Sequence, residues 1–183
     1  MNIEVKNTLK PFDYADSMKI LEKRVEDVFW DEKDELLWIL EHNTVYTAGT
    51  SSKEEDVLDK NLKIVKTNRG GKHTLHSPGQ KVIYFVLNLN KRKKDVRKFI
   101  TTIENSLIKF LNIYNIQAKT FPDRVGIWVT EVHNKPLAKE EKIGAIGLRL
   151  KKWITYHGLS FNINPDLNYY NSIHACGLKD YKI

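Results

Sequence analysis

The chain has 183 residues, of which 41% are hydrophobic and 29% charged, a composition typical of a globular domain. No apolar run approaches the roughly 20 residues that span a bilayer, and the N-terminus lacks the apolar core of a signal peptide. The one cysteine, Cys176, excludes an internal disulfide. We therefore expect a single domain over residues 1–183, monomeric, cytoplasmic and not bound to membranes. The net charge of +7 favours an acidic partner, although a basic surface that only solvates the protein explains it equally well.

Apolar spacing predicts helices over residues 11–29 and 95–115. The face of the first helix comprises Tyr14, Met18, Leu21, Val25, Val28 and Phe29. Strands are predicted over residues 35–42, 63–68, 81–89, 125–130, 142–150 and 151–164, and a short helix over 165–173. Runs of strands between a few helices favour an α+β fold over a regular βαβ repeat.

The segment "NRGGKHTLHSPGQ", residues 68–80, is predicted to be a loop that brings its backbone close to a ligand. Its "GKHT" resembles the end of a phosphate-binding P-loop, but Lys66 and His73 occupy the positions where that motif needs glycine and Ser or Thr. No G-x-G-x-x-G motif is present either. These motifs therefore indicate neither ATP nor a dinucleotide.

Two loose pairs could be considered for metal binding: His73 with His76, and His174 with Cys176. Zinc usually takes four ligands in recognisable pairs, at least three of them from protein. We predict no metal, and expect some of these histidines to brace loops through backbone hydrogen bonds.

The predicted strand at residues 142–150 begins with Lys142 and contains two glycines, which weaken a strand unless something approaches its backbone. Alternation predicts that Lys142, Gly144 and Ile146 share one face. Lys142 then either presents an ammonium group to a cleft or is a solvated lysine at a strand start. Gly158, after His157, is likewise expected to leave room for a ligand.

Cys176 is followed directly by Gly177, which places the thiol at a bend. A lone cysteine is more often an inert buried side chain than a nucleophile. A neighbouring cation would lower its pKa and activate it. The residues alone leave both interpretations open.

Four segments in order resemble the octanoyltransferases of protein lipoylation: "TVYTAGT" (44–50), "RGGKHTLHSPGQKVIYFVLNL" (69–89), "KIGAIGLRLKKWITYHGLSFNIN" (142–164) and "ACGLKD" (175–180). The resemblance implies the α+β catalytic domain shared with biotin and lipoate ligases, a mixed sheet packed with helices. It implies transfer of an octanoyl group from octanoyl-acyl carrier protein to a lysine of lipoyl domains, in 2-oxoacid dehydrogenases and the glycine cleavage H protein. No cofactor is implied, because the donor is already a thioester.

The resemblance also implies residue roles. Cys176 would carry the octanoyl group as a thioester, and Lys142 would lower the thiol pKa and shuttle protons. Backbone N–H groups of Gly177 or a neighbouring loop would stabilise the oxyanion. The acyl-binding loop would be Arg69, Gly70, Gly71, Lys72, His73, Thr74, Leu75 and His76. Two further substrate-binding segments would be Ala145, Ile146 and Gly147, and Gly158, Leu159 and Ser160, the last being commonly alanine in the family.

Two alternatives remain. An ATP-dependent lipoate or biotin ligase would share the fold but would need no cysteine. A basic binding module would explain the charge, but the interleaved aromatics of an RNA-binding sheet are missing, so no nucleic-acid partner is expected. The chain ends at Ile183, before the Thr-Ser step and C-terminal helix usual in the family, which suggests a shortened C-terminus.

Overall fold

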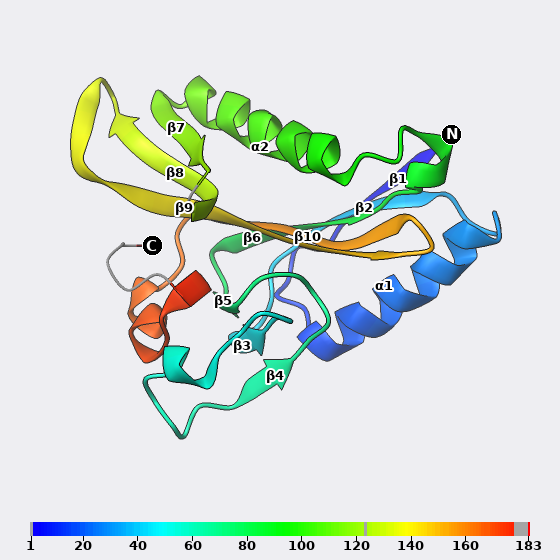
Figure 1. The fold of residues 1–183 in the computed structure, drawn as a ribbon, viewed down its shortest axis with the longest axis horizontal. Helices are drawn as coiled ribbons and strands as arrows, with labels where there is room; N and C mark the ends of the chain where they lie inside the picture. The colour runs from blue at the N-terminus through cyan, green and yellow to red at the C-terminus, as the bar shows by residue number, and fades with distance from the viewer. Residues whose placement is uncertain (1, 123, 178–182) are drawn as a thin grey trace.

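The computed structural model describes residues 2–122, 124–177 and 183, with only the backbone of Cys176 described. These residues form a seven-stranded sheet, a three-stranded sheet and two long helices (Figure 1). The large sheet contains, in spatial order, β1 (Ile3–Asn7), β2 (Glu35–Leu40), β6 (Gln80–Val86), β10 (Ile154–Asn162), β9 (Lys135–Lys151), β8 (Arg124–Val132) and β7 (Ile116–Phe121). Its neighbours are antiparallel except β1 and β2, which are parallel.

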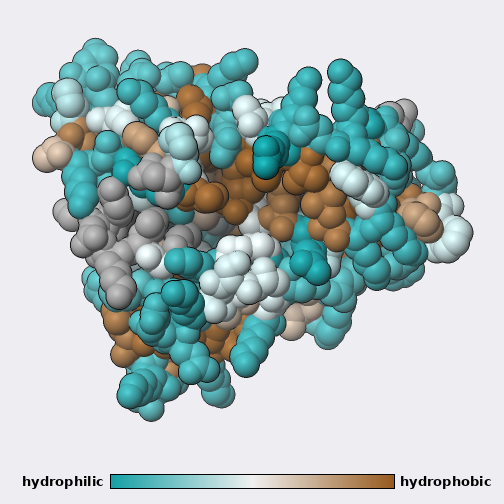
Figure 2. Space-filling view, viewed as in Figure 1, coloured by the Kyte–Doolittle hydropathy of each residue, from teal (hydrophilic) through white to brown (hydrophobic). Residues whose placement is uncertain are grey.

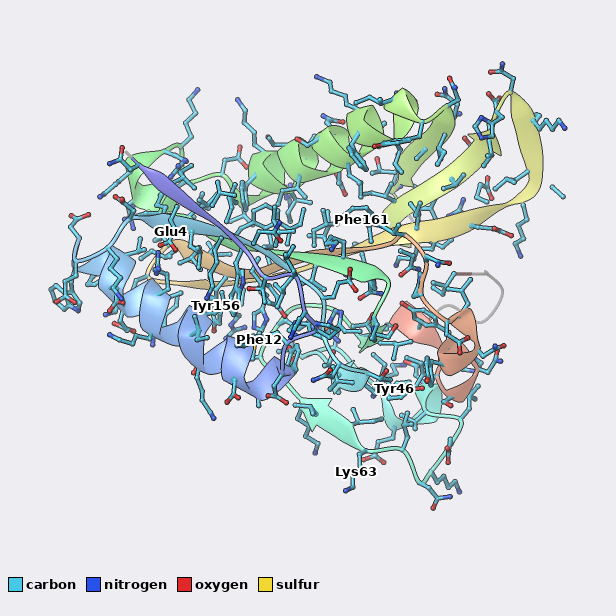
Figure 3. The ribbon with its side chains drawn as sticks, turned by 180° about the vertical axis from the view of Figure 1, so that it is seen from behind. Glu4, Phe12, Tyr46, Lys63, Tyr156 and Phe161 are labelled. Carbon is cyan, nitrogen blue, oxygen red and sulfur yellow. The ribbon has the colours of Figure 1, made fainter. Side chains whose placement is uncertain are left out.

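The helices cover opposite faces of this sheet (Figure 1). Helix α1 (Tyr14–Phe29) packs its apolar stripe on β2, β6 and β10, and α2 (Val96–Ile113) covers β7 to β10 on the other face. Figure 3 shows two side chains of β10 in these two layers, Tyr156 toward α1 and Phe161 toward α2. Neither these helices nor any other in the described part is long and apolar enough to cross a membrane.

The small sheet lies on the α1 side of the large one (Figure 1). Its strands are β4 (Ile64–Lys66), β3 (Val45–Ala48) and β5 (His73–His76), with β3 in the middle. Short helical turns complete the chain: η1 (Glu54–Asp56), η2 (Leu89–Lys91), η3 (Leu167–Ser172) and η4 (Ala175–Gly177). Leu75 packs with Tyr46, Ile173 and Ala175, so the C-terminal turns are held against this sheet.

Both predicted helices form, and each begins after an aspartate whose side chain accepts from a backbone N–H in the first turn. The predicted start at Pro11 was wrong by three residues, because Phe12 pairs with His42 in an isolated bridge instead of entering the helix. The single strand predicted over 151–164 was also wrong at its start. Lys152 and Trp153 adopt positive φ and form the two-residue turn between β9 and β10.

Candidate active site

A pocket of about 360 Å³ lies between the large sheet and the segment 69–76, a size within the range of small-molecule sites. Two rows of paired residues cross β9, β10 and β6 under it. The first row is Ala145, Ser160 and Val82, and the second is Gly147, Gly158 and Tyr84. Figure 2 shows apolar residues gathered in a band across the middle of the face on which β9 and β10 run in Figure 1.

Arg69 braces the loop that forms the opposite wall. Its guanidinium donates to Thr47 O at 2.9 Å, to Lys72 O at 2.7 Å and to Gly70 O at 3.0 Å. Five N–H donors in a planar fork allow one buried side chain to hold several carbonyls at once. Arg69 therefore shapes the loop that borders the pocket, in addition to lining it.

Glycines in the sheet allow close approach of other backbone segments. A Cβ at Gly147 would lie 3.1 Å from Gly70 O, so the loop rests directly on β9. A Cβ at Gly158 would lie 1.9 Å from Ile83 O. The expectation that Gly158 leaves room for a ligand was therefore incomplete: the residue lines the pocket, but the neighbouring strand β6 is what requires a glycine there.

Lys142 enters the pocket because of a bulge in β9. Ile127 pairs with Gly144, but Trp128, the next residue of β8, pairs with Lys142. The extra residue, Ile143, packs toward α2, and a Cβ at Gly144 would also point toward α2. Lys142 therefore turns to the opposite, pocket side of β9. The prediction that Lys142 and Gly144 share a face was wrong, since strict alternation does not pass through a bulge.

The ammonium group of Lys142 is buried, with 4% of the residue exposed, and donates to Val125 O at 2.7 Å. It also lies 5.5 Å from the centroid of the Trp128 ring, a distance at which a cation is attracted to the ring face. Gly126 adopts φ +128°, and a Cβ there would lie 2.4 Å from Lys142 Cε. The turn at Val125 and Gly126 thus fixes where this cation sits.

The backbone of Cys176 lies in η4, while its side chain falls outside the described part of the chain. Gly177 lines the same pocket as Lys142 and has φ +67°. A Cβ at Gly177 would lie 2.4 Å from Lys72 Nζ, so a second lysine reaches the bend that follows the cysteine. The N–H group of Gly177, one of the expected oxyanion donors, donates instead to His174 O at 2.8 Å.

The pocket wall also includes two tyrosines and, besides His73, two histidines, of which only His76 was predicted to bind substrate. These four residues are Tyr14, His76, Tyr84 and His157. Burial lowers the pKa of His76 to about 3 and that of His157 to about 4, so both rings are neutral at physiological pH. Tyr14 was predicted only as a member of the apolar helix face, and no pattern in the sequence marked it as part of a pocket wall.

The predicted binding residues, apart from Leu75, line this pocket together with Lys142. Leu75 is fully buried in the core between β5 and the C-terminal turns. The fold thus brings the loop 69–76, the middle of β9 and the middle of β10 around one cavity.

Comparison with known proteins identifies the family of the chain. The sequence profile of the family described as Lipoyl protein ligase A/B catalytic domain matches residues 13–182. The chain is 45% identical over 172 residues to an octanoyltransferase from Wolbachia pipientis subsp. Culex pipiens (strain wPip), covering 93% of this chain and 82% of the relative. It is 42% identical over 183 residues to an octanoyltransferase from Ehrlichia chaffeensis (strain Arkansas), covering 99% and 83%.

Among solved structures, a bi-partite lipoate protein ligase from Thermoplasma acidophilum superposes with a TM-score of 0.66. The alignment covers 94% of this chain and 66% of that one, at 14% identity, and therefore shows similarity of the fold only. The predicted α+β fold of the biotin and lipoate ligase type is confirmed.

Proposed function

Since the chain belongs to the octanoyltransferase family, among the lipoyl protein ligase A/B catalytic domains, we propose that it transfers an octanoyl group from octanoyl-acyl carrier protein to a lysine of lipoyl domains. The observation that carries this proposal is the single pocket shared by Lys142, the bend at Gly177 and the three predicted binding segments. The acceptors would be the lipoyl domains of 2-oxoacid dehydrogenases and the glycine cleavage H protein.

The reaction would proceed in two acyl transfers. The Cys176 thiolate attacks the carbonyl carbon of the donor thioester, the bond to the carrier sulfur breaks, and the carrier thiolate takes up a proton. The ε-amine of the acceptor lysine then attacks the new thioester, loses a proton and releases the Cys176 thiolate. Lys142, buried next to the pocket and bearing exchangeable protons, would supply the first proton and remove the second.

The pocket supports an acyl rather than a phosphorylated substrate. Its middle is lined by small and apolar residues, including Val82, Ala145 and Leu159. Burying each methylene of an octanoyl chain there contributes about 0.8 kcal/mol. The cation Lys72 reaches Gly177 and Lys142 lines the same pocket, so both could act on a thiolate and a developing oxyanion formed there.

Intact mass spectrometry tests this function. The protein mixed with octanoyl-acyl carrier protein, without ATP, should gain one octanoyl group on the peptide containing Cys176. Adding a lipoyl domain should move that group to the domain's lysine, and a domain with this lysine changed to arginine should accept none. Cys176→Ser should form no adduct. Octanoylation of the lipoyl domain only from free octanoate and ATP would instead identify a ligase.

A further inference from the structure

The side chain of Lys72 lies against the turn that contains the predicted nucleophile. Lys72 directly precedes β5, which packs against η4. A Cβ at Gly177 would lie 2.4 Å from Lys72 Nζ and 2.6 Å from Lys72 Cδ. Since a carbon–carbon bond is about 1.5 Å long, the ammonium group lies within roughly 4 Å of Gly177 Cα. Consecutive Cα atoms are about 3.8 Å apart, so it also lies within roughly 8 Å of Cys176 Cα.

The main chain on both sides of this contact favours it. Lys72 O accepts from Arg69 Nη2 at 2.7 Å and from the Gly49 N–H at 3.2 Å, so the backbone at Lys72 is fixed. On the other side, Gly177 adopts φ +67° and has no side chain in the space that the lysine occupies. The approach of Lys72 to the turn therefore depends on a held loop and on the glycine that follows the cysteine.

The charge of Lys72 is not compensated by a neighbouring group. Within the described part of the chain, its ammonium group has no hydrogen bond, ion pair or aromatic ring contact. The other cations that line the pocket differ in this respect. Lys142 donates to Val125 O at 2.7 Å, and Arg124 lies 3.4 Å from a carboxylate oxygen of Glu140. Lys72 thus brings to the pocket a positive charge that an anion formed at the turn can pair with.

We propose that the Lys72 ammonium is a second cation of the reaction and acts by its charge alone. The Gly177 N–H donates to His174 O at 2.8 Å, so it is not available to an anion at this turn. Lys72 stabilises the negative charge on the Cys176 sulfur before attack and on the carbonyl oxygen of the acyl group during each transfer. Lys142 keeps the proton transfers assigned to it. This inference rests on the proposed octanoyl transfer, which gives Cys176 its role.

The test is the rate of Cys176 alkylation by iodoacetamide as a function of pH, which gives the apparent pKa of the thiol. Lys72→Met keeps the length of the side chain and removes its charge. The apparent pKa should rise by about 0.5 to 1 unit, and alkylation at pH 7 should slow roughly three- to tenfold. Lys72→Arg should retain both alkylation and transfer, whereas Lys142→Arg should lose transfer. Lys66→Met is the matched control, since Lys66 is exposed on β4 and does not line the pocket. It should keep the parental pKa.

The kcat/KM for a small neutral octanoyl thioester gives a second readout, and it should fall in Lys72→Met by at least the same factor as alkylation. A parental alkylation profile in Lys72→Met overturns the inference. So does a loss seen only with octanoyl-acyl carrier protein, which would assign Lys72 to docking of the carrier. A parent whose thiol pKa depends on Lys72 but which forms no octanoyl adduct contradicts the proposed function and leaves the effect of Lys72 on the thiol intact.

Discussion

Lys142 Nζ donates to the main-chain carbonyl of Val125 at 2.7 Å, so a backbone atom of β8 fixes the position of the buried ammonium group on β9. The contact depends on the absence of a side chain at Gly126. A Cβ there would lie 2.4 Å from Lys142 Cε and 2.7 Å from Gly144 O, which is too close for either atom. The cation is therefore positioned by the shape of the strand as well as by its own side chain.

Gly126→Ala should reduce octanoyl transfer by on the order of 100-fold, because a displacement of about 1 Å in a catalytic group is enough for such a loss. The measurement is kcat/KM for transfer, with the melting temperature taken on the same samples. Thr130→Ala, on the same strand but outside the pocket, is the control and should retain activity. A folded Gly126→Ala protein with parental activity would show that the position of Lys142 is not set here.

Two variants of Lys142 distinguish the effect of its charge on the thiol from its role in proton transfer. Lys142→Ala should slow alkylation of Cys176 by iodoacetamide at neutral pH, with partial recovery at higher pH, because thiolate forms less readily without the cation. Lys142→Arg keeps the charge but does not readily release a proton. It should therefore retain alkylation better than transfer. Equal alkylation rates in parent, alanine and arginine proteins would exclude Lys142 as the activator of the thiol.

The sequence predicted the two helix faces and the segments that line the pocket, because both depend on local residue patterns and on the order of motifs along the chain. Helical periodicity fixes which side chains face the sheet. The order of the glycine loop, the Lys142 strand and the Gly158 strand carries the resemblance, and the fold brings these segments to one cavity. Membership of the octanoyltransferase family, predicted from those motifs, is confirmed by the relatives.

The remaining features depend on contacts between segments far apart in the chain. The bulge at Ile143 arises from a register shift between β8 and β9, and no local sequence pattern indicates it. The prediction that residues 68–80 form a loop was wrong for His73–His76, which form β5 because β3 supplies their hydrogen-bond partners. The short strand β1 was not predicted, and it forms alongside β2. The place of Tyr14 in the pocket lining requires α1 to meet the loop 69–76 and the large sheet.

Buried neutral histidines predict that acid weakens the fold. Burial lowers the pKa of His76 to about 3 and of His157 to about 4, whereas an unfolded histidine has a pKa of about 6.5. As pH falls below that value, the unfolded chain binds protons that the folded chain does not, so the free energy of unfolding decreases. Between pH 7 and 5 the loss is at most about 2 kcal/mol for each ring.

Urea unfolding at pH 7, 6 and 5 measures this loss. His157→Asn should flatten the pH dependence, since asparagine tolerates the positive φ of 59° and does not titrate. His133→Asn is the matched control, because His133 also has positive φ, of 48°, but is exposed. It should leave the slope unchanged. A slope as steep in His157→Asn as in the parent would assign the acid sensitivity to other groups.

The basic run at residues 91–98 is the candidate surface for steering an acidic carrier protein. Arg92 pairs with Glu35 and Lys91 with Asp31, whereas Lys93 and Lys94 are exposed. The Lys94 ammonium lies 5.6 Å from the Trp153 ring, at the turn that ends β9. Since Lys142 is about 30 Å away along that strand, this run is too distant to affect a small substrate in the pocket.

Reversing Lys93 and Lys94 to glutamate should therefore raise the KM for octanoyl-acyl carrier protein severalfold at low salt, and leave kcat/KM for a small neutral octanoyl thioester unchanged. The loss should shrink as salt rises, because screening limits exposed charges to roughly 8 Å at 0.15 M. Lys60→Glu with Lys63→Glu makes the same change in net charge on an exposed loop of the small sheet, where Figure 3 shows Lys63 at the opposite pole from α2. If both double variants raise the KM equally, total charge rather than this run governs docking, and if neither does, the run serves only to keep the protein in solution.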